Sequence, residues 1–346
     1  MAPADATVPR GEQLMMETVI SRCPLGIGMH SYTEAWRPAG PEGGSPRFGG
    51  ALDFLEYAHS IGAAGVQVAL NAAEEANPAP LRSRIAGLGI RFEGQLSLPR
   101  AESDVPRFET TARAIRVAGA TIARTAVLSG RRYETFRSDA EFMDFSQRGW
   151  TSLTLAEPVL RRHRLRLAVE NHKDWLAPEL AGILRRLASE WVGACVDLGN
   201  NLALLEDPYA VVEELAPFAV STHIKDMALR DDADGLLLAE VPLGEGSLDL
   251  PRLVRVLRRA NPEVALMLEM ITRDPLRIPC LTQAYWATFE TVPAVRLAAA
   301  WARVREAAGR EPLPRTSQLP AVERLRAEDD NVRRCLAWAT RHAAAL

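Results

Sequence analysis

Long apolar runs, paired cysteines and an excess of one charge are all missing from this chain. Its 346 residues include four cysteines that lie far apart and form no C-x-x-C pair, so the sequence predicts neither a zinc ribbon nor a disulfide framework. No run approaches the roughly 20 apolar residues of a membrane-spanning helix, and the first residues carry no apolar signal segment. We therefore expect a cytoplasmic protein with no membrane partner.

Positive charge does not exceed negative charge. The chain has 41 lysines and arginines against 44 aspartates and glutamates, which gives a net charge of -3. A chain with this net charge is not attracted to the phosphate backbone of a nucleic acid, so we expect no nucleic-acid partner. A local basic patch is an alternative that the net charge does not exclude. No G-x-G-x-x-G motif follows the first predicted strand, which disfavours a dinucleotide-binding fold.

Short apolar runs alternate with amphipathic segments along most of the chain. The first pattern is typical of buried strands and the second of helices. The predicted strands are 25–30, 65–70, 90–96, 121–128, 165–170, 192–197, 219–225 and 264–269. The predicted helices are 51–61, 79–87, 105–118, 139–163, 177–189, 207–215, 248–259 and 288–307. Eight strands alternating with eight helices favour an α/β fold of the closed (β/α)8 TIM barrel type over an open sheet.

The barrel is predicted to occupy residues 23–310. We expect a flexible N-terminal leader at 1–22, because that segment is polar and shows no sustained periodicity. Prolines at 312, 314 and 320 precede a charged amphipathic run, which predicts a C-terminal helical extension over 311–346 with one extra helix. This helix can pack on the barrel or on a neighbouring subunit, so a homodimer is an open alternative.

Four predicted strands in succession end in a metal-ligand type of residue: Glu170, Asp197, His223 and Glu269. Each alone has an ordinary explanation, such as a helix cap, a surface ion pair or a core histidine. In a parallel barrel, however, the strand ends converge on one face, and three carboxylates so close together repel one another unless a cation neutralises them. Three oxygen ligands with one imidazole suit one divalent metal ion, with Mn²⁺ as first choice and Mg²⁺, Co²⁺, Fe²⁺ or Zn²⁺ as alternatives.

The motifs around these residues resemble a known superfamily. AVENH at Glu170, CVDLGN at Asp197, THIKD at His223 and LMLEM at Glu269 are similar to the xylose isomerase-like TIM barrel superfamily, the sugar phosphate isomerase/epimerase family. The resemblance covers about residues 25 to 310. It implies a divalent metal at the four positions and, as in the ketose epimerases, a proton shuttle between Glu170 and Glu269.

Two positions differ from the ketose epimerases. Asn200 stands where they have a substrate-binding histidine, and Leu176 stands where they have a second glutamate. Their sugar contacts therefore do not carry over, although Asn200 remains a candidate substrate contact. The more distant endonuclease IV needs additional histidine and carboxylate ligands, and six histidines in all are a short supply for that role.

Other polar and aromatic residues are predicted near the strand ends. His172 is a candidate general acid or base, or a residue that orients a ligand. Lys225 can hold a substrate oxyanion or pair with a nearby carboxylate, and Arg273 can anchor substrate or brace its own loop. His30 and Trp36 are predicted to face the substrate from the end of the first strand and the loop that follows it.

The function predicted from these residues is that of a metal-dependent sugar isomerase or epimerase. Glu170, Glu269 or His172 would take the proton next to a carbonyl, and the metal would hold the resulting enediolate. The alternative is a lyase or dehydratase that eliminates a β-substituent from a keto sugar or a 3-keto-glycoside. A non-catalytic sugar-binding barrel and a nuclease resembling endonuclease IV are less favoured. The expected partner is a small sugar or keto sugar.

Overall fold

The computed structural model describes residues 23–37, 47–289, 292–306 and 312–346. The leader predicted for residues 1–22 lies outside this part of the chain, as does the predicted boundary at residues 310 and 311. The division into leader, barrel and extension therefore stays a prediction, although the described residues show what the barrel and the extension contain.

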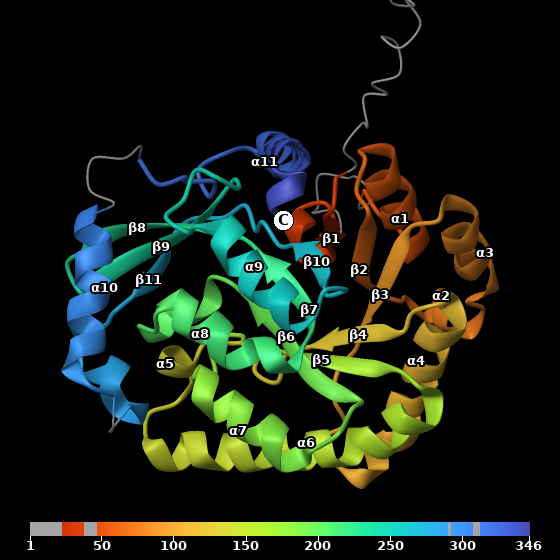
Figure 1. Ribbon diagram of the computed structural model, residues 1–346, viewed down its shortest axis with the longest axis horizontal. Helices are drawn as coiled ribbons and strands as arrows, with labels where there is room; N and C mark the ends of the chain where they lie inside the picture. Colours follow the sequence, from red (N-terminus) through yellow and green to blue (C-terminus); the bar gives the residue numbers. More distant parts are fainter. Residues whose placement is uncertain (1–22, 38–46, 290–291, 307–311) are drawn as a thin grey trace, which may run out of the picture.

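Eight parallel strands form a closed barrel at the centre of the molecule (Figure 1). They follow one another in the order β1-β10-β7-β6-β5-β4-β3-β2, and β2 pairs again with β1. The strands are β1 (Gly26–Gly28), β2 (Gly65–Ala69), β3 (Arg91–Gln95), β4 (Ile122–Thr125), β5 (Arg166–Glu170), β6 (Val192–Asp197), β7 (Ala219–Ile224) and β10 (Ala265–Leu268). The predicted TIM barrel is thus confirmed.

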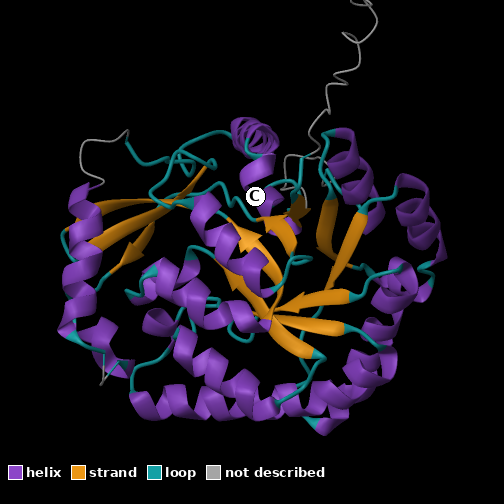
Figure 2. Ribbon diagram, viewed as in Figure 1, coloured by secondary structure: helices purple, strands orange, loops and turns teal. Residues whose placement is uncertain are grey.

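Helices lie outside this barrel, and most of them surround it (Figure 2). They are α1 (Ala51–Ser60), α2 (Ala72–Ala76), α3 (Ala79–Leu88), α4 (Val105–Ala118), α5 (Arg132–Thr135), α6 (Asp139–His163), α7 (Ala177–Leu187), α8 (Pro208–Leu215), α9 (Leu250–Ala260), α10 (Ala294–Glu306) and α11 (Ala321–Arg341). Side-chain caps fix several starts, because Ser138, Asp207 and Asp249 accept hydrogen bonds from backbone N–H groups in the first turns of α6, α8 and α9. The helix predicted over 288–307 begins later, at Ala294.

The sequence predicts neither a strand nor a helix for residues 226–247, only a loop between the seventh strand and the next helix, and this prediction is wrong. This segment forms β8 (Asp226–Asp232) and β9 (Gly235–Val241), which pair antiparallel, and β11 (Leu276–Ile278) completes a three-stranded sheet beside the barrel. Gly235 has a φ of 156°, and a Cβ atom there would lie 2.1 Å from the carbonyl oxygen of Ile278. Glycine therefore permits both the turn and the close approach of β11.

The C-terminal extension contains the predicted helix, α11, which packs on its own barrel. The fully buried carboxylate of Glu328 accepts hydrogen bonds from the backbone N–H groups of Glu34 at 2.7 Å and Ala35 at 3.2 Å. The hydroxyl of Tyr32 donates to Asp329 at 3.0 Å. These contacts fasten α11 to the loop that follows β1 (Figure 1).

The four cysteines are buried and form no disulfide. Within the described residues, no helix has both the length and the apolar character needed to cross a membrane.

Candidate metal centre

The four predicted ligands meet at the carboxyl ends of neighbouring strands. Glu170 ends β5, Asp197 ends β6, His223 lies next to the end of β7, and Glu269 follows β10 directly. One ligand atom from each residue lies within 4.8 Å of all the others, and all four side chains are buried. The four residues predicted from the strand ends therefore lie close together, because the ends of the parallel strands meet on one face of the barrel.

The imidazole of His223 provides a test of whether a cation fits here. Its Nε2 lies 2.8 Å from Oε1 of Gln67, an amide oxygen that can only accept, so Nε2 carries the proton. Its Nδ1 then presents a lone pair toward Glu170 Oε1 at 3.4 Å and Glu269 Oε1 at 3.4 Å, and it is buried without a hydrogen-bond partner. A lone pair facing carboxylate oxygens is repulsive unless a cation lies between them, so this donor set fits a divalent metal.

The electrostatics of the cluster indicate the same demand for positive charge. Burial by itself lowers the pKa of His223, but Cys195, Glu269 and Glu170 together outweigh burial and raise the pKa well above its ordinary value. Without a metal ion, the imidazole would have to supply the missing charge by taking up a second proton.

Two buried cations flank the ligands. Arg124, on β4, donates from Nε to Oε2 of Glu170 at 2.6 Å, and its side chain is 6% exposed. Lys225 places its Nζ 2.8 Å from Oδ2 of Asp197 and also forms an ion pair with Glu269. Lys225 therefore forms ion pairs with two of the predicted metal ligands. This is the second of the two roles predicted for it, pairing with a nearby carboxylate.

These cations determine the charge state of the two glutamates. Burial raises the pKa of Glu170, but Arg124 and His223 outweigh this effect and hold the pKa well below its ordinary value. The same balance holds for Glu269, where burial is outweighed by His223 and Lys225. Both carboxylates are thus ionised, which is the state in which they can bind a metal ion.

Behind the ligands, a row of buried polar groups holds His223 in place. Gln67 on β2 donates from Nε2 to Oε2 of Glu93 on β3 at 2.9 Å, and the Ser221 hydroxyl donates to the same oxygen at 2.7 Å. Because its amide nitrogen is used for Glu93, Gln67 turns its oxygen to the imidazole. This arrangement directs Nδ1 of His223 toward the carboxylates.

Asn200 lies between two ligands. Its Nδ2 donates to Oε1 of Glu170 at 2.8 Å, its backbone N–H donates to Oδ1 of Asp197 at 2.7 Å, and Lys173 donates to its side-chain oxygen. The residue predicted as a substrate contact thus braces the ligands in this structure.

His172 is half-buried and lies two residues after Glu170. Its Nδ1 is 2.8 Å from the carbonyl oxygen of Leu128, so Nδ1 carries a proton and Nε2 can accept one. Burial lowers the pKa of His172 to about 4, so the ring is neutral at neutral pH. Its proposed role as acid or base remains a prediction.

The remaining predicted contacts occupy different places. His30 lies on a 3-10 turn (Met29–Tyr32) that follows β1, not at a strand end, and its Nε2 is 3.0 Å from Nε2 of Gln95. Arg273 donates to Glu240 at 2.9 Å. Both line a cavity of about 620 Å³ at the rim of the barrel. Trp36 instead packs against Phe48 and Phe54 in an aromatic cluster.

Sequence reasoning missed Arg124, Gln67 and Glu93. Each is a polar or charged residue inside an otherwise apolar strand, in the segments IART, GVQVA and RFEGQ. A buried polar side chain needs a hydrogen-bond or ion-pair partner in the interior. A polar residue within an apolar strand was therefore the signal from which such a contact could have been predicted. It does not say which partner is involved.

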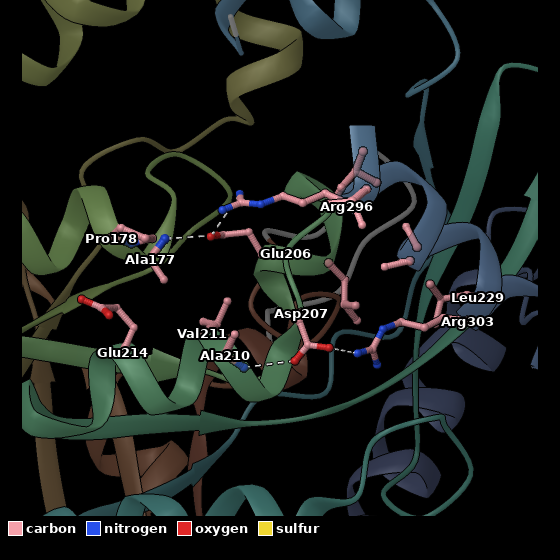
Figure 3. A pocket seen from close by; sticks show the side chains of 15 residues that line it. Ala177, Pro178, Glu206, Asp207, Ala210, Val211, Glu214, Leu229, Arg296 and Arg303 are labelled. Carbon is pink, nitrogen blue, oxygen red and sulfur yellow. Dashed lines mark hydrogen bonds and ion pairs between the residues drawn. The ribbon is translucent and has the colours of Figure 1, made fainter. Parts of the chain in front are cut away.

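A second cavity, of about 310 Å³, lies among α7, α8 and α10, away from the four ligands (Figure 3). Figure 3 shows Arg296 directed toward Glu206 and Arg303 directed toward Asp207, in agreement with the ion pairs between them. Its charged walls thus pair with one another, and we locate the chemistry at the ligand cluster.

Comparison with known proteins agrees with this fold. A family model described as xylose isomerase-like TIM barrel matches residues 55–301. A 3-oxo-isoapionate decarboxylase of Pectobacterium atrosepticum is 28% identical over 241 residues, which are 68% of this chain and 81% of the relative.

Solved structures with the same fold include two at low sequence identity. One is a xylose isomerase-like TIM barrel protein of Mycobacterium smegmatis in complex with magnesium, with a TM-score of 0.54, 16% identity and coverage of 81% of this chain and 97% of that one. The other is the 3-keto-D-glucoside 4-epimerase of E. coli, with a TM-score of 0.52, 13% identity and coverage of 82% and 99%. The chain belongs to the xylose isomerase-like TIM barrel family.

Proposed function

We propose that this protein is a divalent-metal-dependent enzyme that converts a keto-sugar substrate through an enolate. The observation that carries the proposal is the convergence of Glu170, Asp197, His223 and Glu269 around one point, with the lone pair of His223 facing the carboxylates. A divalent cation there would act as a Lewis acid for negative charge on a substrate oxygen. Mn²⁺ remains the first choice for this donor set, and the magnesium complex of a protein with the same fold supports Mg²⁺ as an alternative.

Within this chemistry, a lyase reaction fits the site better than proton shuttling between the two glutamates. Epimerisation needs a carboxylate that accepts a proton from carbon, and Arg124 and Lys225 make Glu170 and Glu269 poor acceptors. The same two cations would stabilise negative charge that moves onto a substrate oxygen. An epimerase remains the second candidate, supported by the epimerase among the proteins of the same fold.

The specific lyase reaction that we favour is decarboxylation of a 3-oxo sugar acid. The bond from the carboxylate carbon to its neighbour breaks, carbon dioxide leaves, and the electron pair passes to the ketone oxygen. A proton from solvent then adds to the carbon that lost the carboxylate. No base is needed for the first step, which agrees with ionised, paired glutamates, and the decarboxylase at 28% identity supports the same choice.

The test uses Mn²⁺-loaded protein in D₂O with two kinds of substrate. One is 3-oxo-isoapionate, the compound named for the relative, and the others are the neutral keto sugars D-fructose and D-tagatose. We expect carbon dioxide from the acid, with one deuterium in the product by NMR, and no reaction of the neutral sugars.

Matched aspartate variants provide the control. Asp197→Asn changes a ligand and should abolish the reaction, whereas Asp207→Asn changes the cap of α8 and should preserve it, since asparagine also caps helices. Deuterium entering a neutral keto sugar without release of carbon dioxide would favour the epimerase instead. Inertness of the loaded protein toward all three compounds would contradict this choice of substrate and reaction.

A further inference from the structure

The cavity of about 620 Å³ is built by three segments that are distant in sequence. They are the loop after β1, the loop after β10 and the C-terminal segment that leads into α11. Arg273 in its wall follows the ligand Glu269 by four residues, and four extended residues span at most about 14 Å. His30 lines the same cavity, and it lies near enough to Glu269 and Glu170 for their charges to act on its imidazole, so the cavity borders the metal centre.

Guanidinium groups give this cavity spare hydrogen-bond donors. Arg273 uses Nη2 to bind Glu240 at 2.9 Å, and Arg324 uses Nε to pair with Glu34 at 3.1 Å. Arg324 also donates from Nη1 to the carbonyl oxygen of Leu319 at 2.7 Å. Each guanidinium has five N–H groups, and the others find no acceptor within the residues that the structure describes. The side chains are 32% and 27% exposed, so a ligand can reach them.

The carboxylates of the same cavity are already engaged. Asp274 accepts hydrogen bonds from the backbone N–H groups of Thr316 at 2.6 Å and Ser317 at 2.9 Å, and from the Ser317 hydroxyl at 2.7 Å. Glu34 pairs with both Arg324 and Arg37. The hydrogen-bonding capacity that remains for a ligand is therefore that of donors, which suits a ligand rich in acceptor oxygens.

The C-terminal segment is hydrogen-bonded to both loops of the cavity. Glu328 binds the backbone of the loop after β1, and Asn331 donates to the hydroxyl of Thr272 at 3.0 Å in the loop after β10. Thr316, Ser317 and Arg324 all lie beyond residue 301, where the match to the family model ends. The wall that they form is therefore additional to the matched part of the barrel.

We propose that this cavity is a subsite for an oxyanion group of the substrate, a carboxylate or a phosphate, and that Arg324 of the C-terminal helix determines the preference for it. Guanidinium groups bind both oxyanions through charge-assisted hydrogen bonds. The inference rests on the proposed function, because it takes the metal centre as the place where the same molecule reacts. It extends that function by assigning the C-terminal extension to substrate selection.

Calorimetric titration with three six-carbon ketoses tests the proposal. The probes are D-fructose, its carboxylate counterpart D-fructuronate and its phosphate counterpart D-fructose 6-phosphate. We expect at least one oxyanion to bind the Mn²⁺-loaded protein about tenfold more tightly than D-fructose. Which of the two binds more tightly identifies the group. Arg324→Gln should remove the preference and leave the affinity for D-fructose and the bound manganese unchanged.

Two further arginine variants make the result specific. Arg324→Lys should retain part of the preference, because the charge remains, and Arg326→Gln should retain all of it, because Arg326 is an exposed residue of the same helix outside the cavity. Equal affinities for the three probes in the unaltered protein, or a full preference in Arg324→Gln, would overturn the subsite. The titrations are repeated on metal-free protein, which measures the oxyanion preference independently of the metal. Failure of the protein to bind manganese would then refute the proposed function without deciding the subsite.

Discussion

The two halves of the barrel contribute different polar residues to the same centre. Strands β5, β6, β7 and β10 end in the four ligands, whereas β2, β3 and β4 contribute Gln67, Glu93 and Arg124 from within the strands. The half formed by β5, β6, β7 and β10 would bind the metal, and the half formed by β2, β3 and β4 helps to fix the charge and direction of the groups that bind it. The comparison teaches that a metal site depends on its supporting residues as well as on its ligands.

Loss of a ligand should have the largest effect. His223→Phe removes the single nitrogen ligand from the cluster, and we expect the affinity for Mn²⁺ to fall by more than about 100-fold, beyond the range for supporting residues. Equilibrium dialysis followed by elemental analysis measures it. His163→Gln, on the outer helix α6, should bind manganese as the unaltered protein does. An equal loss in both variants would contradict the assignment.

Loss of Arg124 should act on stability in the metal-free protein. Arg124→Met leaves the fully buried carboxylate of Glu170 without its cation, and breaking a buried pair in this way costs about 3–5 kcal/mol of unfolding free energy. Denaturant unfolding measures the cost. The double variant Arg124→Met/Glu170→Gln should recover much of it, since the unpaired charge is gone. If the two changes are simply additive, Arg124 does not stabilise Glu170.

Gln67 tests how a supporting residue differs from a metal ligand, because it binds His223 and is not one of the four ligands. Gln67→Leu removes the acceptor for Nε2 of His223, and we expect a loss of about 10–100-fold in affinity for Mn²⁺. The matched variant is Gln95→Leu on the adjacent strand β3, where the amide meets His30 instead. A similar loss in both would show that His223 does not depend on Gln67.

The smallest effect is expected for Ser221. Its hydroxyl makes one of the two hydrogen bonds to Oε2 of Glu93, and Gln67 remains bonded when Ser221 is changed to alanine. We expect Ser221→Ala to cost about 1 kcal/mol of unfolding free energy and to change manganese affinity less than Gln67→Leu does. A larger loss of manganese affinity in Ser221→Ala than in Gln67→Leu would contradict the proposal that Gln67 is the more important supporting residue.

The barrel and its ligands could be predicted because both follow from repetition. Alternating strands and helices imply closure, and strand ends converge, so Glu170, Asp197, His223 and Glu269 were placed together without coordinates. The hairpin of β8 and β9 was missed, because its apolar residues do not alternate regularly and only Lys225 separates it from the seventh strand.

The supporting residues could not be predicted for a different reason. Their roles depend on contacts across the barrel, such as Glu93 with Ser221, which are 128 residues apart in sequence. Asn200 was predicted as a substrate contact, whereas for Lys225 the sequence left open whether it holds substrate or pairs with a carboxylate. Distances decide that question, and both side chains contact ligands.

The most direct test of the account is the metal content of the protein. Purified protein is stripped with chelator, incubated with Mn²⁺, dialysed and measured by elemental analysis beside the Glu269→Gln variant. The account predicts about one manganese per chain in the unaltered protein and clearly less in the variant, because one anionic ligand is lost. No manganese in either protein would contradict the metal centre and leave a non-catalytic sugar-binding barrel as the better explanation.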